Sequence, residues 1–360
     1  MQRINTLDSF RGISVIIVML SHFLYGRPHP NTDSFLLPYE DKYEYFDWGG
    51  LGVMFFFIIS GFVIFYTLEK TSTFKQFWVK RFIRLYPSLI IAILLTFTVA
   101  IFFDYELIFP RAHKLHNTIM SSTFIPPQLL NVFSQSIKFE YTDGVYWSLW
   151  PEIQFYLLMS ILFFKTKKPI TLLYIITLTT IIINVFYLKV LDLFITTDNF
   201  PFSSVIYTFW FKKILNLSQY LPYFTMGVLF YKLYLNNKVH INTILIVPLA
   251  IFSFTSSSTI HNFVIACFIA LFFLFIYYPK ILKPLNFKYL QIVGFSSYFL
   301  YLIHQEIGII LMYYIKDWSL ADTVVLPILA SSVCIVLSVL YTRKVDFHIT
   351  SYLKAKLIKK

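Results

Sequence analysis

Residues 50–68 read GLGVMFFFIISGFVIFYTL, nineteen consecutive positions without a charged side chain. About 20 helical residues cross the hydrocarbon core of a bilayer, so this stretch predicts a membrane-spanning helix. Within it, Ser60 and Gly61 are small residues that let a neighbouring helix approach closely. These two positions therefore have a packing interpretation as well as a functional one.

Comparable apolar runs recur from one end of the chain to the other. Of its 360 residues, 58% are hydrophobic, 20% are aromatic and only 13% are charged. An ordinary soluble domain has roughly a quarter charged residues, so the composition excludes a water-soluble globule and favours an all-α, polytopic membrane bundle. The predicted membrane-spanning helices, ten in number, lie at about residues 11–26, 50–68, 87–103, 145–164, 169–188, 218–235, 241–257, 260–278, 295–315 and 321–342.

We expect residues 1–345 to form one membrane domain, followed by a short basic tail at 346–360. The two longest segments between spans, 27–49 and 104–144, are predicted to be short ordered loops or surface helices on the outer side. No small-residue cleavage site follows the run at 11–26. This run therefore predicts a retained first span rather than a removed signal peptide.

The formal net charge of +12 raises the question of nucleic-acid binding. With both termini in the cytoplasm, 21 of the 30 Lys and Arg residues fall on the inner side and 9 on the outer side. This is the positive-inside distribution of a membrane protein, and no nucleic-acid partner is predicted. We expect the lysines of the C-terminal tail to contact anionic lipid headgroups. They are Lys354, Lys356, Lys359 and Lys360.

Candidate chemistry lies in polar side chains within the apolar runs, because each such group costs at least a few kcal/mol at membrane depth. The two cysteines, Cys267 and Cys334, also lie in apolar runs. A thiol there most often serves as a small hydrophobe. Neither redox chemistry nor a bound metal is predicted.

The first polar cluster is DSFRG at residues 8–12, followed by His22. Arg11 and His22 are eleven positions apart, about three helical turns, so they face the same way at roughly 16 Å along the axis. Arg11 is expected at the cytoplasmic mouth and His22 near mid-membrane. The structural alternative is a snorkelling arginine and a core histidine bonded to a neighbouring helix.

A second cluster, RFIRLYP at residues 81–87, lies where the third span is expected to begin. Arg81 and Arg84 are three apart and share a helix face, so their guanidinium groups can grip a phosphate together. The alternative is an ordinary positive-inside anchor.

Two further clusters place ionisable groups in apolar surroundings. WSLWPEIQFY at residues 147–156 sets Glu152 about two turns below the outer surface, where a carboxylate needs a partner. It is either a general base or a clamp that orders the bundle. SSYFLYLIHQE at 296–306 sets Ser297 and His304 on one helix face, beside Glu306. Packing hydrogen bonds are the alternative there.

Taken in order, these motifs resemble those of the acyltransferase family 3 membrane enzymes, and the resemblance covers essentially the whole chain. It rests on the spacing of Arg11 and His22, FF at 55–56 with SGF at 60–62, RFIRLYP at 81–87, and two later groups. The later groups are WSL at 147–149 with Glu152, Phe155 and Tyr156, and Ser297-Tyr298, Tyr301-Leu302 and His304.

The resemblance implies an O-acyltransferase of the bacterial cytoplasmic membrane, acting on an envelope carbohydrate or lipid-linked sugar. Its donor is an acyl-CoA, most often acetyl-CoA, used as a co-substrate with no tightly bound cofactor. His22 is the implied catalytic base or acyl-carrying nucleophile, with Glu152 orienting it or engaging the acceptor. Arg11, Arg81 and Arg84 are the implied donor-binding residues. Possible lining residues are Ser60, Trp147, Ser148, Tyr156, Ser297, Tyr298 and His304.

The sequence departs from the family pattern at two places. Met54 stands where members commonly carry an acidic residue after Gly-Val, so no role of that acid is transferred. Residues 341–346, YTRKVD, lack the Glu and nearby Pro often found there and are assigned no role. Some relatives append an extracytoplasmic domain, whereas only 18 residues follow position 342 in this sequence. We therefore expect the membrane domain to act alone or to pass its acyl group to a separate protein.

Rival classes remain. A secondary transporter or flippase also has buried ionisable groups. Such a protein is expected to consist of two repeated halves, and we see no matching halves in this sequence. A non-catalytic scaffold leaves the spacing of Arg11 and His22 as a coincidence. The other large histidine-containing class of membrane acyltransferases has its key histidine in a later span. The acceptor, the acyl group and the oligomeric state are not encoded in any motif that we recognise.

Overall fold

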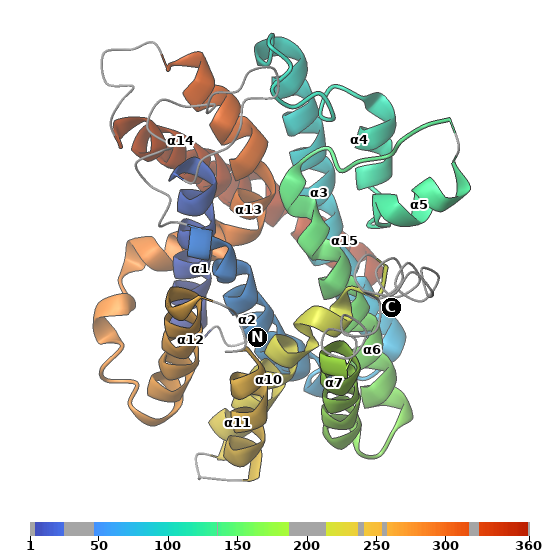
Figure 1. The fold of residues 1–360 in the computed structure, drawn as a ribbon, viewed down its shortest axis with the longest axis vertical. Helices are drawn as coiled ribbons and strands as arrows, with labels where there is room; N and C mark the ends of the chain where they lie inside the picture. The colour runs from blue at the N-terminus through green and yellow to red at the C-terminus, as the bar shows by residue number, and fades with distance from the viewer. Residues whose placement is uncertain are drawn as a thin grey trace, which may run out of the picture.

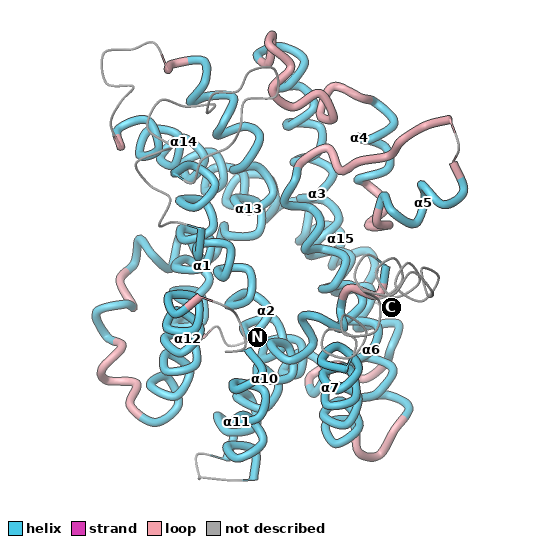
Figure 2. The backbone as a smooth tube through the Cα atoms, viewed as in Figure 1, coloured by secondary structure: helices cyan, strands magenta, loops and turns pink. Residues whose placement is uncertain are grey.

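The computed structural model describes residues 4–24, 47–134, 136–186, 214–236, 241–253, 258–316 and 324–358. Throughout these ranges every regular element is helical, as Figure 2 shows. This confirms the all-α class. The longer helices are α1 (Asn5–Leu24), α2 (Gly52–Glu69), α3 (Phe74–Phe103), α6 (Leu149–Lys165), α7 (Pro169–Phe186), α10 (Leu217–Asn236), α11 (Ile241–Ser253), α12 (Thr259–Tyr277), α13 (Lys288–Tyr314), α14 (Val325–Tyr341) and α15 (Phe347–Leu357).

Six helical stretches in the described part are long and apolar enough to cross a membrane. They are Asn5–Leu24, Asp47–Glu69, Phe74–Phe103, Thr259–Tyr277, Lys288–Tyr314 and Val325–Leu357. The protein is therefore a multi-pass membrane protein. Helices α6, α7, α10 and α11 match the other predicted spans in position, and whether they cross the bilayer stays a prediction.

Helix α3 begins more than three turns before the predicted start at residue 87. Thr73 caps it, because its Oγ1 accepts a hydrogen bond from the Gln76 amide at 3.2 Å. Pro87 lies inside the helix and does not start it. Arg81 and Arg84 are consequently interior positions of a 30-residue helix and not part of a loop before it.

The centre of the bundle is built from α1, α2 and α13, and α10 packs along α2 (Figure 1). Glycines allow two of these contacts. A Cβ atom on Gly294 of α13 would collide with the carbonyl oxygen of Asp8 in α1. A Cβ atom on Gly61 of α2 would likewise collide with the carbonyl oxygen of Phe224 in α10. The packing interpretation of Gly61 is thus confirmed, and it leaves the side chain of Ser60 available for other contacts.

Residues 104–134 and 136–148 contain two short helices, α4 (Leu115–Ser121) and α5 (Pro127–Phe133), and then the 3-10 turn η2 (Gly144–Ser148). Asp104 fixes its start, because its carboxylate accepts the amide hydrogens of Ile108 at 2.8 Å and Phe109 at 2.9 Å. The predicted ordered loop with surface helices is therefore found here. Most of the other predicted outer segment, 27–49, lies outside the described residues.

The C-terminal residues continue α14 without a break. A π-helical turn, η6 (Thr342–Asp346), joins α14 to α15, and α15 packs along α3. The predicted tail at 346–360 is therefore a helix over most of its length. A second 3-10 turn, η5 (Lys283–Leu285), precedes α13.

Candidate active site

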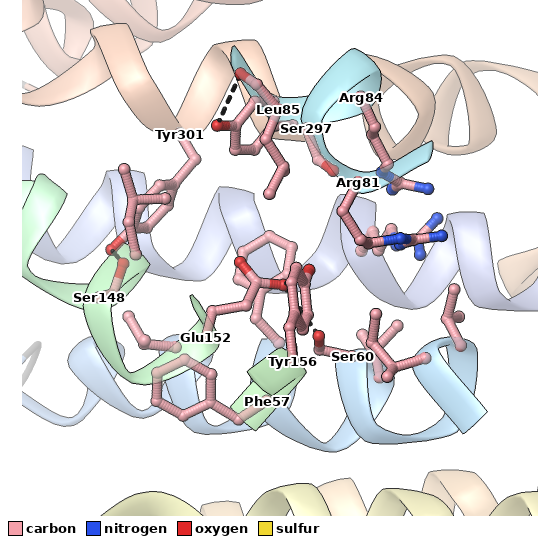
Figure 3. Close-up of a pocket in the computed structure, with 18 residues that line it drawn as sticks. Phe57, Ser60, Arg81, Arg84, Leu85, Ser148, Glu152, Tyr156, Ser297 and Tyr301 are labelled. Atoms are coloured by element: carbon pink, nitrogen blue, oxygen red, sulfur yellow. Dashed lines mark hydrogen bonds between the residues drawn. The ribbon is translucent and has the colours of Figure 1, made fainter. Parts of the chain in front are cut away.

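A cavity of about 90 Å³ lies among α1, α2, α3, α6 and α13. Its polar lining comes from ten side chains: Arg11, Ser60, Arg81, Arg84, Ser148, Glu152, Tyr156, Ser297, Tyr298 and Tyr301. Figure 3 shows the two arginines of α3 at one end and Ser148 and Tyr301 at the other. Segments up to 290 residues apart in the sequence thus meet at one polar cavity inside an apolar bundle.

Glu152 lies in the middle of this cavity, between Ser60 and Tyr156 (Figure 3). Ser60 Oγ donates a hydrogen bond of 2.8 Å to Glu152 Oε1. The Tyr156 hydroxyl donates to the same oxygen. Two side-chain donors thus converge on one oxygen of the Glu152 carboxyl group. Ser60 therefore has a polar role beyond helix packing.

The arginines give the cavity a positive end. Arg81 is buried, donates from Nη2 to Thr67 Oγ1 at 3.2 Å, and lies over the Tyr156 ring at 5.8 Å. Its Nε is buried and makes no hydrogen bond in the described part of the chain. Arg11 pairs with Asp8 at 3.4 Å, and Arg84 is exposed. Three guanidinium groups thus line one cavity. In the described ranges, the one carboxylate within ion-pair distance of any of them is Asp8, which pairs with Arg11.

A larger cavity of about 770 Å³ adjoins the first one and shares Arg11, Arg81, Arg84 and Tyr298 with it. Both ends of the described chain line it, through Ile4 and Ile358. Its charged lining residues are Asp8, Arg11, Lys70, Lys80, Arg81, Arg84, Asp346 and Lys354. A wide basic vestibule therefore leads to a narrow polar cavity.

His22 and His304 do not line either cavity. Their rings lie against each other between α1 and α13, with centroids 5.2 Å apart. His304 is fully buried, and its Nδ1 lies 2.8 Å from the Tyr301 carbonyl oxygen. A carbonyl oxygen can only accept a hydrogen bond, so Nδ1 must be the donor. Nδ1 therefore carries the hydrogen, and the lone pair of the neutral ring is on Nε2.

Tyr301 connects the histidine pair with the small cavity. Its ring contacts His304 at a centroid distance of 5.6 Å. Its hydroxyl lies 2.8 Å from Ser148 Oγ at the far end of the cavity. Tyr301 was not among the expected lining residues, although it lines the small cavity. Its spacing from Ser297 and His304, which puts the three residues on one helix face, could have predicted it from the sequence.

Two of the expected lining residues, Trp147 and His304, lie outside the small cavity. Glu152 was expected to orient His22 or to engage the acceptor, and in the described part of the chain its carboxylate accepts hydrogen bonds from Ser60 and Tyr156. It shares the small cavity with Arg11, Arg81 and Arg84. The Trp147 ring lies tilted against the Tyr220 ring, with centroids 5.4 Å apart, and does not line the small cavity. The remaining expected lining residues do line it: Ser60, Ser148, Tyr156, Ser297 and Tyr298.

A buried ion pair adjoins the histidine pair on the side of residues 104–148. Glu306, two residues after His304, is fully buried and accepts hydrogen bonds from the Arg111 guanidinium. The Gly144 amide donates to Glu306 Oε1 at 3.0 Å, and Gln305 donates to Oε2 at 2.8 Å. The carboxylate thus ties Arg111 and Gly144, which precede α6, to α13.

Asp143 completes this group. Its Oδ2 accepts the Glu306 amide at 3.3 Å, and its Oδ1 accepts the Val145 amide at 3.0 Å. Burial, together with the charge of Glu306, raises the pKa of Asp143 well above its ordinary value. Burial acts to lower the pKa of Arg111, but the charge of Glu306 outweighs it and raises that pKa. No sequence motif marked Arg111 or Asp143, since neither lies in an apolar run.

The fold and the cavities define a multi-pass helical membrane protein with a basic vestibule and a buried polar site. Residues 4–343 match acyltransferase family 3, described as an acyltransferase domain, and the chain belongs to that family. A protein named O-acetyl transferase, from Shigella phage Sf6, is 31% identical over 99 residues, which is 27% of each chain. The chain thus spans about a quarter of that relative in the alignment. No solved structure matches.

Proposed function

We propose that this protein transfers an acyl group, in the simplest case acetyl, from acyl-CoA to a hydroxyl of an envelope carbohydrate or lipid-linked sugar. Acyl transfer is the activity of its family. The observation that carries the donor assignment is the cluster of Arg11, Arg81 and Arg84 where the vestibule meets the small cavity. Arginine forks bind phosphate groups in a bidentate way, and the phosphates of CoA are suitable partners.

The dimensions of the two cavities support this assignment. The vestibule of about 770 Å³ has room for a charged nucleotide portion, whereas the inner cavity of about 90 Å³ has room for a small acyl group. The thioester then points toward Ser148 and Tyr301, beyond the Glu152 carboxylate. In this arrangement the phosphates stay at the basic side, which we propose is the cytoplasmic side of the bacterial inner membrane.

The bond-making step needs a base for the acceptor hydroxyl. We assign this role to His22, because an unperturbed imidazole titrates near neutral pH. The acceptor oxygen loses its proton to His22 and attacks the thioester carbonyl, and the carbon–sulfur bond then breaks. The proton passes from His22 to the departing thiolate, which leaves as CoA thiol. In support of this assignment, His22 contacts His304, and His304 in turn contacts Tyr301, which lines the small cavity.

The donor assignment is tested by replacing Arg81 and Arg84 together with Ala and measuring CoA binding and the acyl-CoA requirement. Each charge-assisted hydrogen bond contributes about 1.5–3 kcal/mol, so we expect at least about a tenfold weaker affinity. Lys at both positions should restore binding only in part, because it lacks the bidentate fork. Lys75→Ala is the control, since Lys75 is exposed on the same helix and lines neither cavity. Unchanged CoA affinity in a correctly inserted double variant contradicts the donor site.

A further inference from the structure

Helix α15 is one wall of the vestibule. The residues near the C-terminus that line this cavity are Phe347, Thr350, Lys354 and Ile358, which are three, four and four positions apart. This spacing puts them on a single helix face. The run Val325–Leu357 has 33 residues, about 50 Å of helix, so it extends well past a hydrocarbon core of about 30 Å. Its last turns therefore project from the membrane-spanning part and cover the vestibule.

The π-helical turn η6 fixes where α15 lies. Ser88 Oγ of α3 donates to Asp346 Oδ1 at 3.1 Å, and the Tyr341 hydroxyl donates to Ser88 Oγ at 3.3 Å. Tyr341 also stacks on Phe299 of α13. Ser88 is one turn from Arg84 on α3, so these contacts hold α15 beside the arginines. Single π-helical turns occur frequently at functional sites.

Lys354 adds a positive charge to the opening of the vestibule. Arg84, Asp346 and Lys354 all line the vestibule, so the two cations share one region. Lys354 is exposed, and no carboxylate in the described part lies within ion-pair distance of its Nζ. Two residues away, Lys356 is exposed but absent from the cavity lining, and its Nζ lies 6.0 Å from the Tyr352 ring centroid. The two lysines thus carry the same charged group but lie on different faces of α15.

We propose that α15 is part of the acyl-donor site and that Lys354 binds a phosphate group of the donor. This inference rests on the proposed function, because it takes the vestibule to be the place of CoA. A phosphate can also come from a lipid headgroup, as expected for these lysines from the sequence. The two sources are separated by the lipid in which the protein is assayed.

The test measures CoA binding by calorimetry to the full-length protein in nanodiscs of phosphatidylcholine, and again with phosphatidylglycerol added. Lys354→Gln should weaken CoA binding about fivefold in both lipids, as expected for one partly exposed charged contact. Lys354→Arg should keep the affinity, and Lys356→Gln should leave it unchanged. Equal thermal unfolding temperatures of the three variants check that the helix still packs.

Each other outcome overturns the inference in a distinct way. If Lys354→Gln binds CoA as well as the unsubstituted protein while the double Ala variant of Arg81 and Arg84 does not, α15 is not part of the donor site, although the proposed function stands. If neither protein loses affinity, the donor assignment itself is wrong. A loss seen with phosphatidylglycerol but not with phosphatidylcholine means that Lys354 contacts headgroups.

Discussion

His22 lies ring to ring with His304, between α1 and α13, and one residue past it Phe23 also contacts the His304 ring. Two imidazoles in contact beside a tyrosine form a polar group inside an apolar bundle. Burying such a group away from water costs free energy, so polar groups of this kind mark functional sites more often than chance would.

Replacing His22 with Gln should lower turnover by about 10²- to 10⁴-fold, the usual contribution of a general base. Gln can keep a hydrogen bond but cannot take up a proton at neutral pH. Expression and insertion should be unaffected, because Gln replaces one neutral polar side chain with another and adds no charge to the span. The measurement is acyl transfer by the purified variant, with CoA binding as the control. Near-normal transfer would reject His22 as the base and direct attention to His304.

Asp143 gives a prediction about pH. A carboxyl with a raised folded-state pKa contributes stability that is fully present below its ordinary pKa of 3.8. This stability is lost as the pH rises through the raised value, because the buried charge then forms beside Glu306. Asp143→Asn should therefore show a flatter fall in unfolding temperature than the unsubstituted protein as the pH increases from 4. Parallel pH profiles of the two proteins would show that Asp143 does not titrate in this way.

At the scale of elements, the sequence predicts what each helix contains better than where it begins. The RFIRLYP motif correctly sets Arg81 and Arg84 on one face, because a three-residue spacing is a local property. The predicted span began at residue 87, whereas α3 begins at Phe74 and contains Pro87. The sequence also does not show which face of α15 meets the vestibule, because this depends on the tertiary contact of Asp346 with Ser88.

The ion pair between Arg111 and Glu306 should fasten the outer segment to α13. Arg111→Ala leaves Glu306 buried without its cation, so we expect the unfolding temperature to fall, with a loss of about 1–3 kcal/mol for a charged hydrogen bond. Adding Glu306→Gln to that variant should recover part of the stability, because the uncompensated charge is gone. Thermal unfolding of the single and double variants measures this coupling. Strictly additive effects would mean that the two residues act independently.

For the whole molecule, the all-helical class and nine residues of the small cavity were predictable from the sequence, because apolar length and helical spacing encode both. Arg111 and Asp143 were not, since they lie in a polar segment where a charged residue needs no explanation. Their importance arises from Glu306, which meets them across more than 150 residues of chain. The number of membrane crossings is also a property of the whole bundle, and within the described ranges six helical stretches meet the requirements of length and composition.

The predicted topology has both termini in the cytoplasm and residues 104–144 outside, as the 21 to 9 distribution of basic residues indicates. It is tested by labelling single cysteines with an impermeant reagent in intact cells, after removal of Cys267 and Cys334. Cysteine at exposed Ile119 should be labelled, and cysteine at exposed Lys167 should be protected until the cells are opened. The reverse pattern would invert the membrane orientation and place the basic vestibule outside.

The most direct test of acyl transfer to the envelope is comparative mass spectrometry of envelope glycans from cells with and without the gene. We predict that glycans from cells without it lack acyl, most simply acetyl, mass units on otherwise intact sugar chains. The unsubstituted gene should restore these units, and the His22→Gln variant should not. Glycans with unchanged acylation would contradict the proposed activity, and loss of whole sugar units would indicate a transporter or flippase instead.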